Sequence, residues 1–216
     1  MPEALDTPAR IIHAAEQLFA AHGFDGVSLR QITKSAGVNV AALNYHHTDK
    51  DTLYSRLLTQ RLRQLHTARM ESLAEAEALA GGAPVPLPTL ARILALPLLQ
   101  PTPAMTGFSP ATRRLIGRLL LEPHPLHAAL IAGELQPSLT RVGQAFRRHQ
   151  PAARPADFVW TYSLVVGALH HAAATLHDMR SRTSGVCADN DAVNAVSNFE
   201  RLVCASFGPP RDIPQY

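Results

Sequence analysis

Residues 28–50 read SLRQITKSAGVNVAALNYHHTDK, and the local signals in this stretch decide the predicted fold. Ser28 opens a capping-box pattern that predicts the start of a short helix, and Gly37 is placed to end it. Asn39 is a typical cap for a second short helix, which we predict over Val40 to about His46. Two short helices joined by a glycine-containing turn are the arrangement that lets the second helix enter the DNA major groove. The stretch therefore predicts a helix-turn-helix.

A longer helix is predicted ahead of this motif. Thr7 and Pro8 are a hydroxyl cap followed by proline at the first helical position. Apolar residues then recur at helical spacing, at Ile11, Ile12, Ala15, Leu18 and Phe19. Gly23 predicts the end of the helix, with Phe24 placed to fold back onto its last turn. This helix would clamp the two short ones and complete a three-helix DNA-binding domain.

The remainder of the chain is also predicted to be helical. A long helix spans Asp49 to Leu79, and the proline- and glycine-rich residues 81–88 after it predict a loop. Beyond the loop we predict helices over Thr89–Leu99, Ser109–Leu121, Leu126–Arg148 with a bend at Pro137, Ala156–Met179 and Asn190–Phe207. No stretch alternates apolar and polar residues as a strand would. The predicted fold is all-α, with about nine helices.

These elements fall into three predicted parts. Residues 1–48 form a helix-turn-helix DNA-binding domain, and residues 49–80 form a long connecting helix. Residues 81–216 form a helical bundle for ligand binding and dimerisation. A chain of 216 residues is long enough to bury a substantial core in this arrangement.

Composition limits the class of protein more than its function. Hydrophobic residues make up 46% and charged residues 17%, which is typical of a globular protein. The opening MPEALDTPAR lacks the pattern of a signal peptide, so we expect the protein in the cytoplasm, and two cysteines fit a reducing compartment. The net charge of +3 is too small to indicate DNA binding by itself.

The predicted second helix of the motif supplies the candidate base contacts. It would present Val40, Ala41, Asn44 and Tyr45 outward, where Asn44 could read adenine and Val40 or Ala41 could meet a thymine methyl. Tyr45, Ser28 and Lys50 suit phosphate oxygens. The predicted DNA-binding residues are Ser28, Arg30, Asn39, Val40, Ala41, Asn44, Tyr45, His46 and Lys50. From spacing alone, a plain corner of two helices in a protein that does not bind DNA fits equally well.

The residues themselves favour DNA binding. From Arg10 to Leu57, the stretches AAEQLFAAHGFDGVSLRQITKSAGV and NVAALNYHHTDKDTLYSRLL resemble the DNA-binding domain of the tetracycline-repressor (TetR) family. The positions that match its helix signature are Leu43, Tyr45, His46 and Lys50. Two positions depart from the signature. Asn44 stands where an aromatic is common, which predicts an altered base preference, and His47 replaces a core phenylalanine.

The resemblance implies a way of working. It implies a homodimer that pairs through its C-terminal helices and binds a near-palindromic operator on double-stranded DNA. It also implies a repressor that is released when a small, mainly apolar effector enters a pocket among the central helices. The stretches RLIGRLLLEP and WTYSLVVGALHHAAATL are similar to the branch that contains fatty-acid-responsive regulators. This similarity implies a fatty acid or an acyl-CoA thioester as the class of effector.

The predicted ligand site draws on the C-terminal half. We interpret Trp160 and His170 as pocket residues, with an apolar wall from the segment 105–119. The predicted ligand-binding residues are Met105, Phe108, Leu115, Leu119, Trp160, Leu164, Gly167 and His170. Ordinary packing between helices is the alternative explanation for each of these residues, and Gly167 and Ala168 also fit a dimer bundle.

Three other functions are weighed against this one. The histidine clusters His124–His127 and His170–His171 lack a cysteine or carboxylate at a ligand spacing, and proline-flanked histidines usually lie on exposed loops. A metal-responsive regulator therefore stays an alternative, and no metal or cofactor is expected. The sequence contains no phosphate-binding glycine loop and no hydrolase or metalloprotease motif, so we do not expect an enzyme. Asn44, Tyr45 and Lys50 on one surface argue against a pure dimerisation module.

Overall fold

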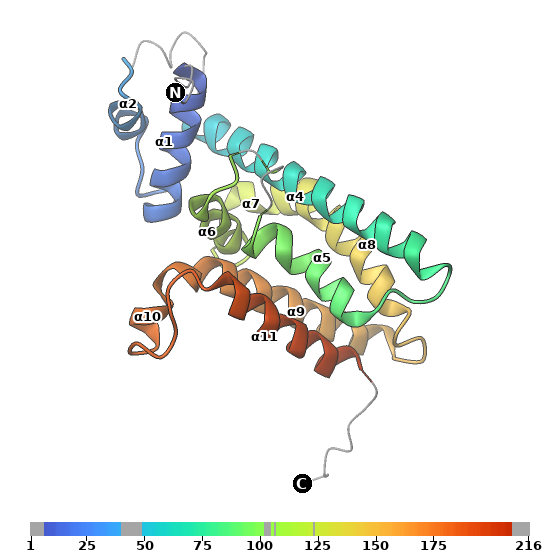
Figure 1. The fold of residues 1–216 in the computed structure, drawn as a ribbon. Helices are drawn as coiled ribbons and strands as arrows, with labels where there is room; N and C mark the ends of the chain where they lie inside the picture. The colour runs from blue at the N-terminus through green and yellow to red at the C-terminus, as the bar shows by residue number, and fades with distance from the viewer. Residues whose placement is uncertain (1–6, 40–48, 102–104, 106, 123, 209–216) are drawn as a thin grey trace.

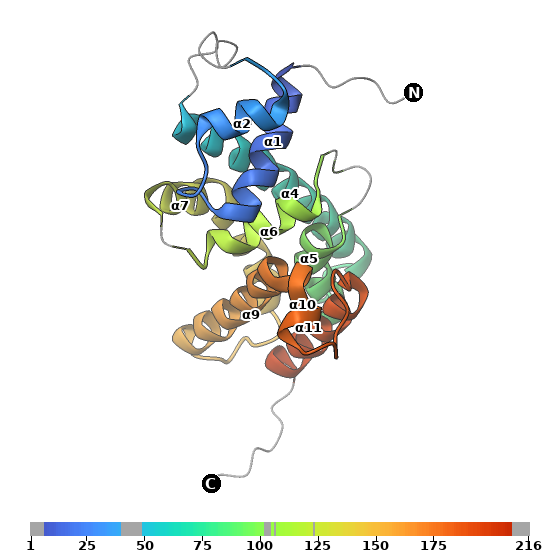
Figure 2. The same cartoon turned by 90° about the vertical axis from the view of Figure 1, so that its left-hand side faces the viewer.

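The described part of the protein is entirely helical. A computed structural model describes residues 7–39, 49–101, 105, 107–122 and 124–208, and these residues contain helices and turns but no strand. Figure 1 shows two helices, α1 and α2, packed at one end of a larger helical bundle. Figure 2, turned by 90°, shows the same two parts, one above the other. The predicted all-α fold is confirmed.

The first two helices begin and end at the residues that the sequence predicts. Helix α1 spans Thr7–His22, and Gly23, at a φ of 73°, ends it with an N–H bond to the carbonyl of Phe19 at 2.9 Å. Helix α2 spans Leu29–Ala36 and begins with a complete capping box between Ser28 and Gln31. Gly37, also in the left-handed region, ends α2. These ends are fixed by contacts within a few residues, which explains why local sequence predicts them.

One long helix runs through both parts of the molecule. Helix α4 spans Lys50–Ala80, and the carboxylate of its cap, Asp49, accepts the N–H of Thr52. Figure 1 shows α4 starting beside α1 and running along the whole bundle. Its buried apolar face comprises Leu53, Leu57, Leu58, Leu62, Leu65 and Leu73. The predicted connecting helix therefore exists and is continuous from the first part to the second.

The remaining helices form the bundle. They are α5 (Leu87–Leu99), α6 (Pro110–Leu119), α7 (Pro125–Leu130), α8 (Gln136–Arg147), α9 (Pro155–Thr175), α10 (Met179–Arg182) and α11 (Ala192–Phe207). The structure differs from the prediction near Pro137, where a π-helical turn at Ile131–Leu135 joins α7 to α8. Proline cannot donate the bond that residue 137 would make to the carbonyl of Gly133, and its ring crowds that carbonyl. The wider π turn just ahead of Pro137 relieves both problems.

Two pairs of helices pack extensively against each other within the bundle. Helix α6 packs on α9, and α5 packs on α11. The approach of α6 to α9 is close at Gly117, where an added Cβ would lie 2.8 Å from the carbonyl carbon of Ala173. The strong apolar stretch predicted over Ala156–Met179 is α9 as far as Thr175, followed by a 3₁₀ turn at Leu176–Asp178.

Candidate nucleic-acid interface and its junction with the bundle

The structure places four of the nine predicted DNA-binding residues. Ser28, Arg30, Asn39 and Lys50 lie within the described residues. The other five, Val40, Ala41, Asn44, Tyr45 and His46, fall in residues 40–48, outside the described part, as do Leu43 and His47. Base contact by the second helix of the motif therefore stays a prediction.

Helix α2 presents an exposed polar and basic side beside that segment. Ser28 is exposed, and its Oγ accepts the N–H of Gln31 at 3.3 Å. Arg30 and Lys34, one turn apart on α2, are both exposed, and so is Asn39 after the turn. Exposed cations and a helix start next to the predicted reading helix are suited to phosphate oxygens.

Lys50, the first residue of α4, holds that helix to the turn between α1 and α2. Its Nζ donates to the carbonyl of Phe24 at 3.2 Å and lies 4.0 Å from the centre of the Phe24 ring. The side chain is therefore engaged in a cation–π contact and is half-buried. The structure gives Lys50 a packing role that the sequence does not predict, while its predicted contact with phosphate stays untested.

Arg10 fixes the turn of the motif and was not among the predicted site residues. Its Nη2 donates to the carbonyls of Ala36 at 2.6 Å and Gly37 at 3.0 Å. These are the free carbonyls at the end of α2, so the cation caps the helix and favours its dipole. The residues are 26 and 27 positions apart, and no local pattern signals a contact over that separation.

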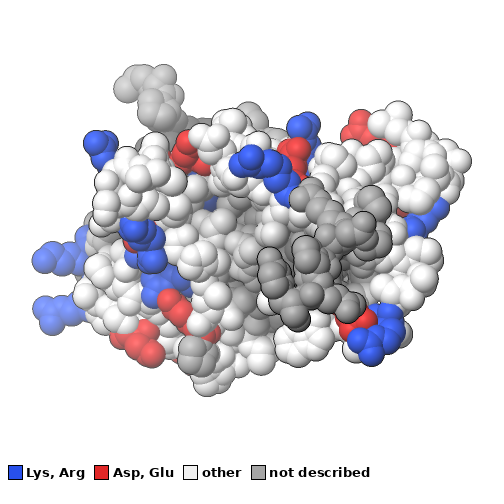
Figure 3. Space-filling model, turned by 90° about the horizontal axis from the view of Figure 1, so that it is seen from below, with Lys and Arg blue, Asp and Glu red and all other residues white. Residues whose placement is uncertain are grey.

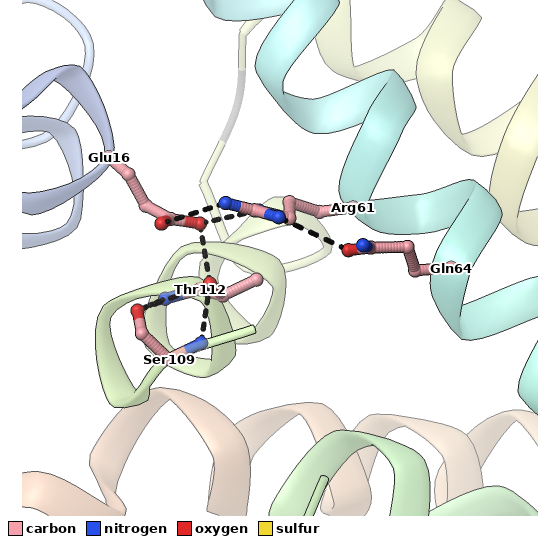
Figure 4. Close-up of polar contacts among 5 residues, drawn as sticks. All are labelled: Glu16, Arg61, Gln64, Ser109 and Thr112. Atoms are coloured by element: carbon pink, nitrogen blue, oxygen red, sulfur yellow. Dashed lines mark hydrogen bonds and ion pairs between the residues drawn. The ribbon is translucent and has the colours of Figure 1, made fainter. Parts of the chain in front are cut away.

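A buried ion pair joins the DNA-binding helices to the bundle. Figure 4 shows Glu16 of α1 facing Arg61 of α4 and Thr112 of α6. Arg61 Nε lies 2.9 Å from Glu16 Oε1, and Arg61 Nη2 lies 3.3 Å from Oε2. Thr112 Oγ1 donates to the same carboxylate, and Glu16 is only 1% exposed. One carboxylate thus binds side chains from two other helices, where water cannot replace them.

A second polar contact holds α6 to α1. Arg118, near the end of α6, donates from Nη1 to the carbonyl of Ala20 at 3.0 Å. Its Nε also pairs with Glu122. Helix α6 is therefore attached to α1 at two points, through Thr112 and through Arg118.

Helix α7 makes a third attachment, through histidines that the sequence places on an exposed loop. That expectation is wrong for His127, which is buried. Its Nδ1 donates to the carbonyl of Glu122 at 2.8 Å, so Nε2 accepts the hydroxyl of Tyr54 at 2.9 Å. Burial lowers the pKa of His127, which favours this neutral form. The ring of His124 lies 4.3 Å from that of Phe24, which extends the contact to the DNA-binding domain.

The predicted ligand wall does not surround one space. Leu115, Leu119 and His170 are buried in the bundle, and Phe108 and Gly167 are half-buried. Met105 is buried but lines an open groove of about 700 Å³ along α4, beside Arg56, Thr59 and Arg63. Trp160 and Leu164 are 70% and 69% exposed on α9, because they lie on its outer side. We therefore remove Trp160 and Leu164 from the ligand wall.

The outer side of α9 and α11 carries several large apolar residues. They are Val159, Trp160 and Leu164 on α9, with Val193 and Leu202 on α11. A groove of about 600 Å³ between these helices is lined by Ala168, Ala172, Phe199 and Leu202, among others. Figure 3 shows the molecule from below, where charged side chains are scattered among a larger uncharged surface.

The described residues give no support to a metal site. No group of three or more histidine, cysteine or acidic residues among them is arranged to hold a metal ion. In the same part of the chain, no helix is long and apolar enough to cross a membrane.

Comparison with known families assigns both parts of the chain. Residues 11–57 match the family model for bacterial regulatory proteins of the tetR family. Residues 92–205, more than half of the chain, match the tetracycline-repressor-like C-terminal domain. The chain belongs to the TetR family. It is therefore a transcriptional regulator with a helix-turn-helix DNA-binding domain and not an enzyme, as the sequence predicts.

Individual relatives match over about a quarter of the chain. The HTH-type transcriptional regulator YttP of Bacillus subtilis is 41% identical over 56 residues, 26% of this chain and 27% of that protein. The HTH-type transcriptional regulator UidR of Escherichia coli is 33% identical over 58 residues, 27% of this chain and 30% of that protein. The matched segment thus spans less than a third of each relative.

Similarity over the whole length is seen at the level of fold. SCO3833, a TetR-family member from Streptomyces coelicolor A3, aligns with a TM-score of 0.58. The alignment covers 96% of this chain and 94% of that one, at 19% identity. The C-terminal match names no class of effector, so the similarity to fatty-acid-responsive regulators stays a prediction.

Proposed function

We propose that this TetR protein is a ligand-responsive repressor. As a homodimer, it would bind a near-palindromic operator in the cytoplasm and leave it when a small, mainly apolar effector binds the bundle. The observation that carries the proposal is the buried junction of Glu16, Arg61 and Thr112, which connects the DNA-binding helices to two helices of the bundle. A regulator that responds to a ligand needs such a connection between its two sites.

Helix α6 is suited to transmit the signal. On one side it is attached to α1 through Thr112 and Arg118. On the other side Gly117 brings its backbone against α9. A ligand that changes the packing of α6 on α9 would therefore move α1, and α4 through Arg61. The coupling requires only that the ligand bind one arrangement more tightly than the other.

The outer side of α9 and α11 supports the homodimer. A patch of exposed large apolar residues is typical of a surface that meets a partner. A two-fold pairing would place the same residues, Trp160 and Leu164 among them, on both sides of the interface. It would also hold the two helix-turn-helix domains of the dimer at a fixed separation, which requires half-sites at a matching spacing on the DNA.

The DNA contacts follow from the described residues and from those of the predicted reading helix. We propose that Ser28, Arg30, Asn39 and Lys50 contact the phosphate backbone. The residues proposed to lie in the major groove or beside it are Val40, Ala41, Asn44, Tyr45 and His46. The effector proposed from the resemblance is a fatty acid or an acyl-CoA thioester.

Selection from a random pool of DNA duplexes tests the function without knowledge of the operator. The full-length protein should enrich a near-palindrome, and native mass spectrometry should show a dimer on it. Asn44→Ala should reduce the preference for the selected duplex over random DNA. Lys50→Ala should weaken binding to both alike and reduce the salt slope by about one. Enrichment of no sequence would contradict the proposal.

A further inference from the structure

One fully buried arginine in the bundle has no carboxylate partner. Arg69 of α4 is 0% exposed, and its Nη2 donates to the carbonyl of Leu94 in α5 at 3.0 Å. Its Nε and Nη1 have no hydrogen-bond partner among the residues that the structure describes. No ion pair joins it to an acidic residue in that part of the chain.

The other buried arginines show how unusual this is. Arg61, about two turns earlier on α4, pairs with Glu16 through two of its nitrogens. Arg113 of α6 also lacks a carboxylate and has an unpaired Nε among the described residues, but it donates to the carbonyl of Leu99 and to the side chain of Asn190. Arg69 is thus buried as deeply as any of them, with a single carbonyl as partner.

A second buried polar side chain lies in the same region. His170 of α9 is 0% exposed and donates from Nδ1 to the carbonyl of Val166 at 2.9 Å. Its Nε2 has no partner among the described residues. Burial, followed by the nearby charge of Arg69, lowers the pKa of His170 to about 4. Helix α5, whose Leu94 carbonyl accepts the bond from Arg69, packs against α9, the helix that carries His170.

An uncompensated positive charge in an apolar interior is unfavourable, because burial removes the water that would solvate it. A bound anion would restore the missing interaction, since a charge-assisted hydrogen bond is stronger than a neutral one. We propose that Arg69 and His170 bind the head group of the effector and that this head group is a monoanion, such as a carboxylate. This inference rests on the proposed function, because it concerns the ligand of the same regulator.

The surroundings specify a single negative charge on an apolar molecule, which selects the free fatty acid over the acyl-CoA thioester. Arg69 supplies one permanent positive charge and the imidazole of His170 is neutral, so a dianion such as phosphate would bury a second charge without a partner. The carbonyl that Arg69 contacts belongs to Leu94 and the carbonyl that His170 contacts belongs to Val166, and both of these apolar residues are buried. An apolar body attached to the carboxylate would replace packing of the same kind.

The position of Arg69 also connects the head group to the DNA-binding helices. Arg69 and Arg61 lie on the buried side of the same helix, and Arg61 holds Glu16 of α1. An anion that draws the Arg69 side chain toward itself would act on α4 about two turns from that junction. The effector would thereby bias the arrangement of the junction without contacting it.

Matched ligands test the charge of the head group. Full-length protein is titrated with butanoate, octanoate, dodecanoate and benzoate, and with the alcohol and the amine of each carbon skeleton, by thermal shift and calorimetry. At least one carboxylate should raise Tm and bind about tenfold or more tightly than its alcohol, with the amine weakest. If no carboxylate binds more tightly than its matched alcohol, the proposal is wrong.

Variants test the assignment to Arg69. Arg69→Met keeps the length of the side chain, removes the charge, and should raise Tm in the absence of ligand. It should abolish the preference for the carboxylate, whereas Arg69→Lys should retain part of it. Arg141→Met is the matched control, because Arg141 forms an exposed pair with Glu77, and it should leave the preference unchanged. A preference that survives Arg69→Met overturns the assignment.

The two proposals fail in different ways. If the carboxylate binds through Arg69 but does not change the affinity for the selected DNA, the anion site stands and the ligand-responsive function fails. If an uncharged ligand alone releases the DNA, the function stands and the anion site fails. Because the wild-type ligand series is decisive by itself, a variant that does not fold leaves the test intact.

Discussion

Arg61 and Arg69 show how a single pairing partner changes the role of a buried charge. Both lie on the inner side of α4, and both are removed from water. Arg61 has a carboxylate on α1, so its charge holds two helices together. Among the described residues, Arg69 has only a backbone carbonyl as partner, so its charge is available to a ligand. The carboxylate of Glu16 gives the charge of Arg61 a structural role. We propose a ligand-binding role for the charge of Arg69, which has no carboxylate partner among the described residues.

The Glu16–Arg61 pair should contribute strongly to stability. Glu16→Gln keeps the shape but leaves the buried guanidinium without a countercharge, so the free energy of unfolding should fall by about 3 kcal/mol. Urea denaturation measures this loss. The control is Glu134→Gln, which breaks the more exposed pair with Arg63 and should cost no more than about 1 kcal/mol. Similar small losses in both variants would contradict the prediction.

His170 should make stability depend on pH in a defined window. Its folded-state pKa is about 4, below the value near 6.5 of an unfolded chain, so the unfolded state takes up the proton first as pH falls. The free energy of unfolding should therefore decrease from about pH 6.5 down to about pH 4, by about 3 kcal/mol from this residue.

The contribution of His170 is isolated by a difference. His127 also has a lowered pKa and changes stability in the same direction. The pH profile of the wild type therefore contains the contributions of both histidines. His170→Phe should be less sensitive to pH than the wild type in this window, while the two profiles run parallel above about pH 7. Parallel profiles over the whole range would show that His170 is not neutral and buried in solution.

Helix α6 contacts both α1 of the DNA-binding domain and α9 of the bundle. Thr112 and Arg118 attach it to α1, and Gly117, on the side toward α9, allows the backbones to approach. An element held on both sides can move only together with its neighbours. Its short length of 10 residues helps, because a short helix moves as one body.

Gly117→Ala should disturb both stability and DNA binding. The new Cβ would clash with backbone atoms of α9. Because backbone atoms cannot change rotamer as a side chain can, α6 would have to shift. We expect a loss of about 1–3 kcal/mol and a changed affinity for the selected duplex. Gly133→Ala is the control, since an added Cβ there meets nothing within 4 Å. An unchanged stability and DNA affinity in Gly117→Ala would rule out tight coupling through α6.

At the scale of the whole molecule, the apolar outer side of α9 and α11 is the largest feature that the single chain leaves unexplained. Trp160 and Leu164 are largely exposed there, although residues of this type normally bury their surface. Because the described residues do not cover these side chains, we propose a second copy of the chain as the partner, since two-fold symmetry would cover both patches at once.

Leu164→Arg should prevent dimer formation. A charge on each side of a two-fold interface faces its own copy, which adds repulsion to the loss of apolar contact. Size-exclusion chromatography with light scattering should show a monomer, and affinity for the selected duplex should fall because the half-sites are no longer bound together. Leu79→Arg, at the exposed end of α4, is the control and should remain dimeric. A dimeric Leu164→Arg would place the interface elsewhere.

The sequence by itself determined the local architecture. The capping box at Ser28, the left-handed glycines at Gly23 and Gly37, and the cap at Ser109 all stand where they were predicted. Each depends on contacts within about four residues, so the signal and the structure lie in the same short stretch. The family resemblance also predicted the overall fold and a role as a transcriptional regulator. The family matches over residues 11–57 and 92–205 confirm both.

The tertiary structure alone decided which residues face one another and which face outward. Glu16 and Arg61 are 45 positions apart, and an arginine in a long helix is expected at its surface, so neither the junction nor Arg69 could be predicted. Helix α9 is apolar on several sides, so periodicity could not separate its core side from the outer side with Trp160. Burial depends on what the rest of the chain places against a helix, and that is not contained in the helix's own residues.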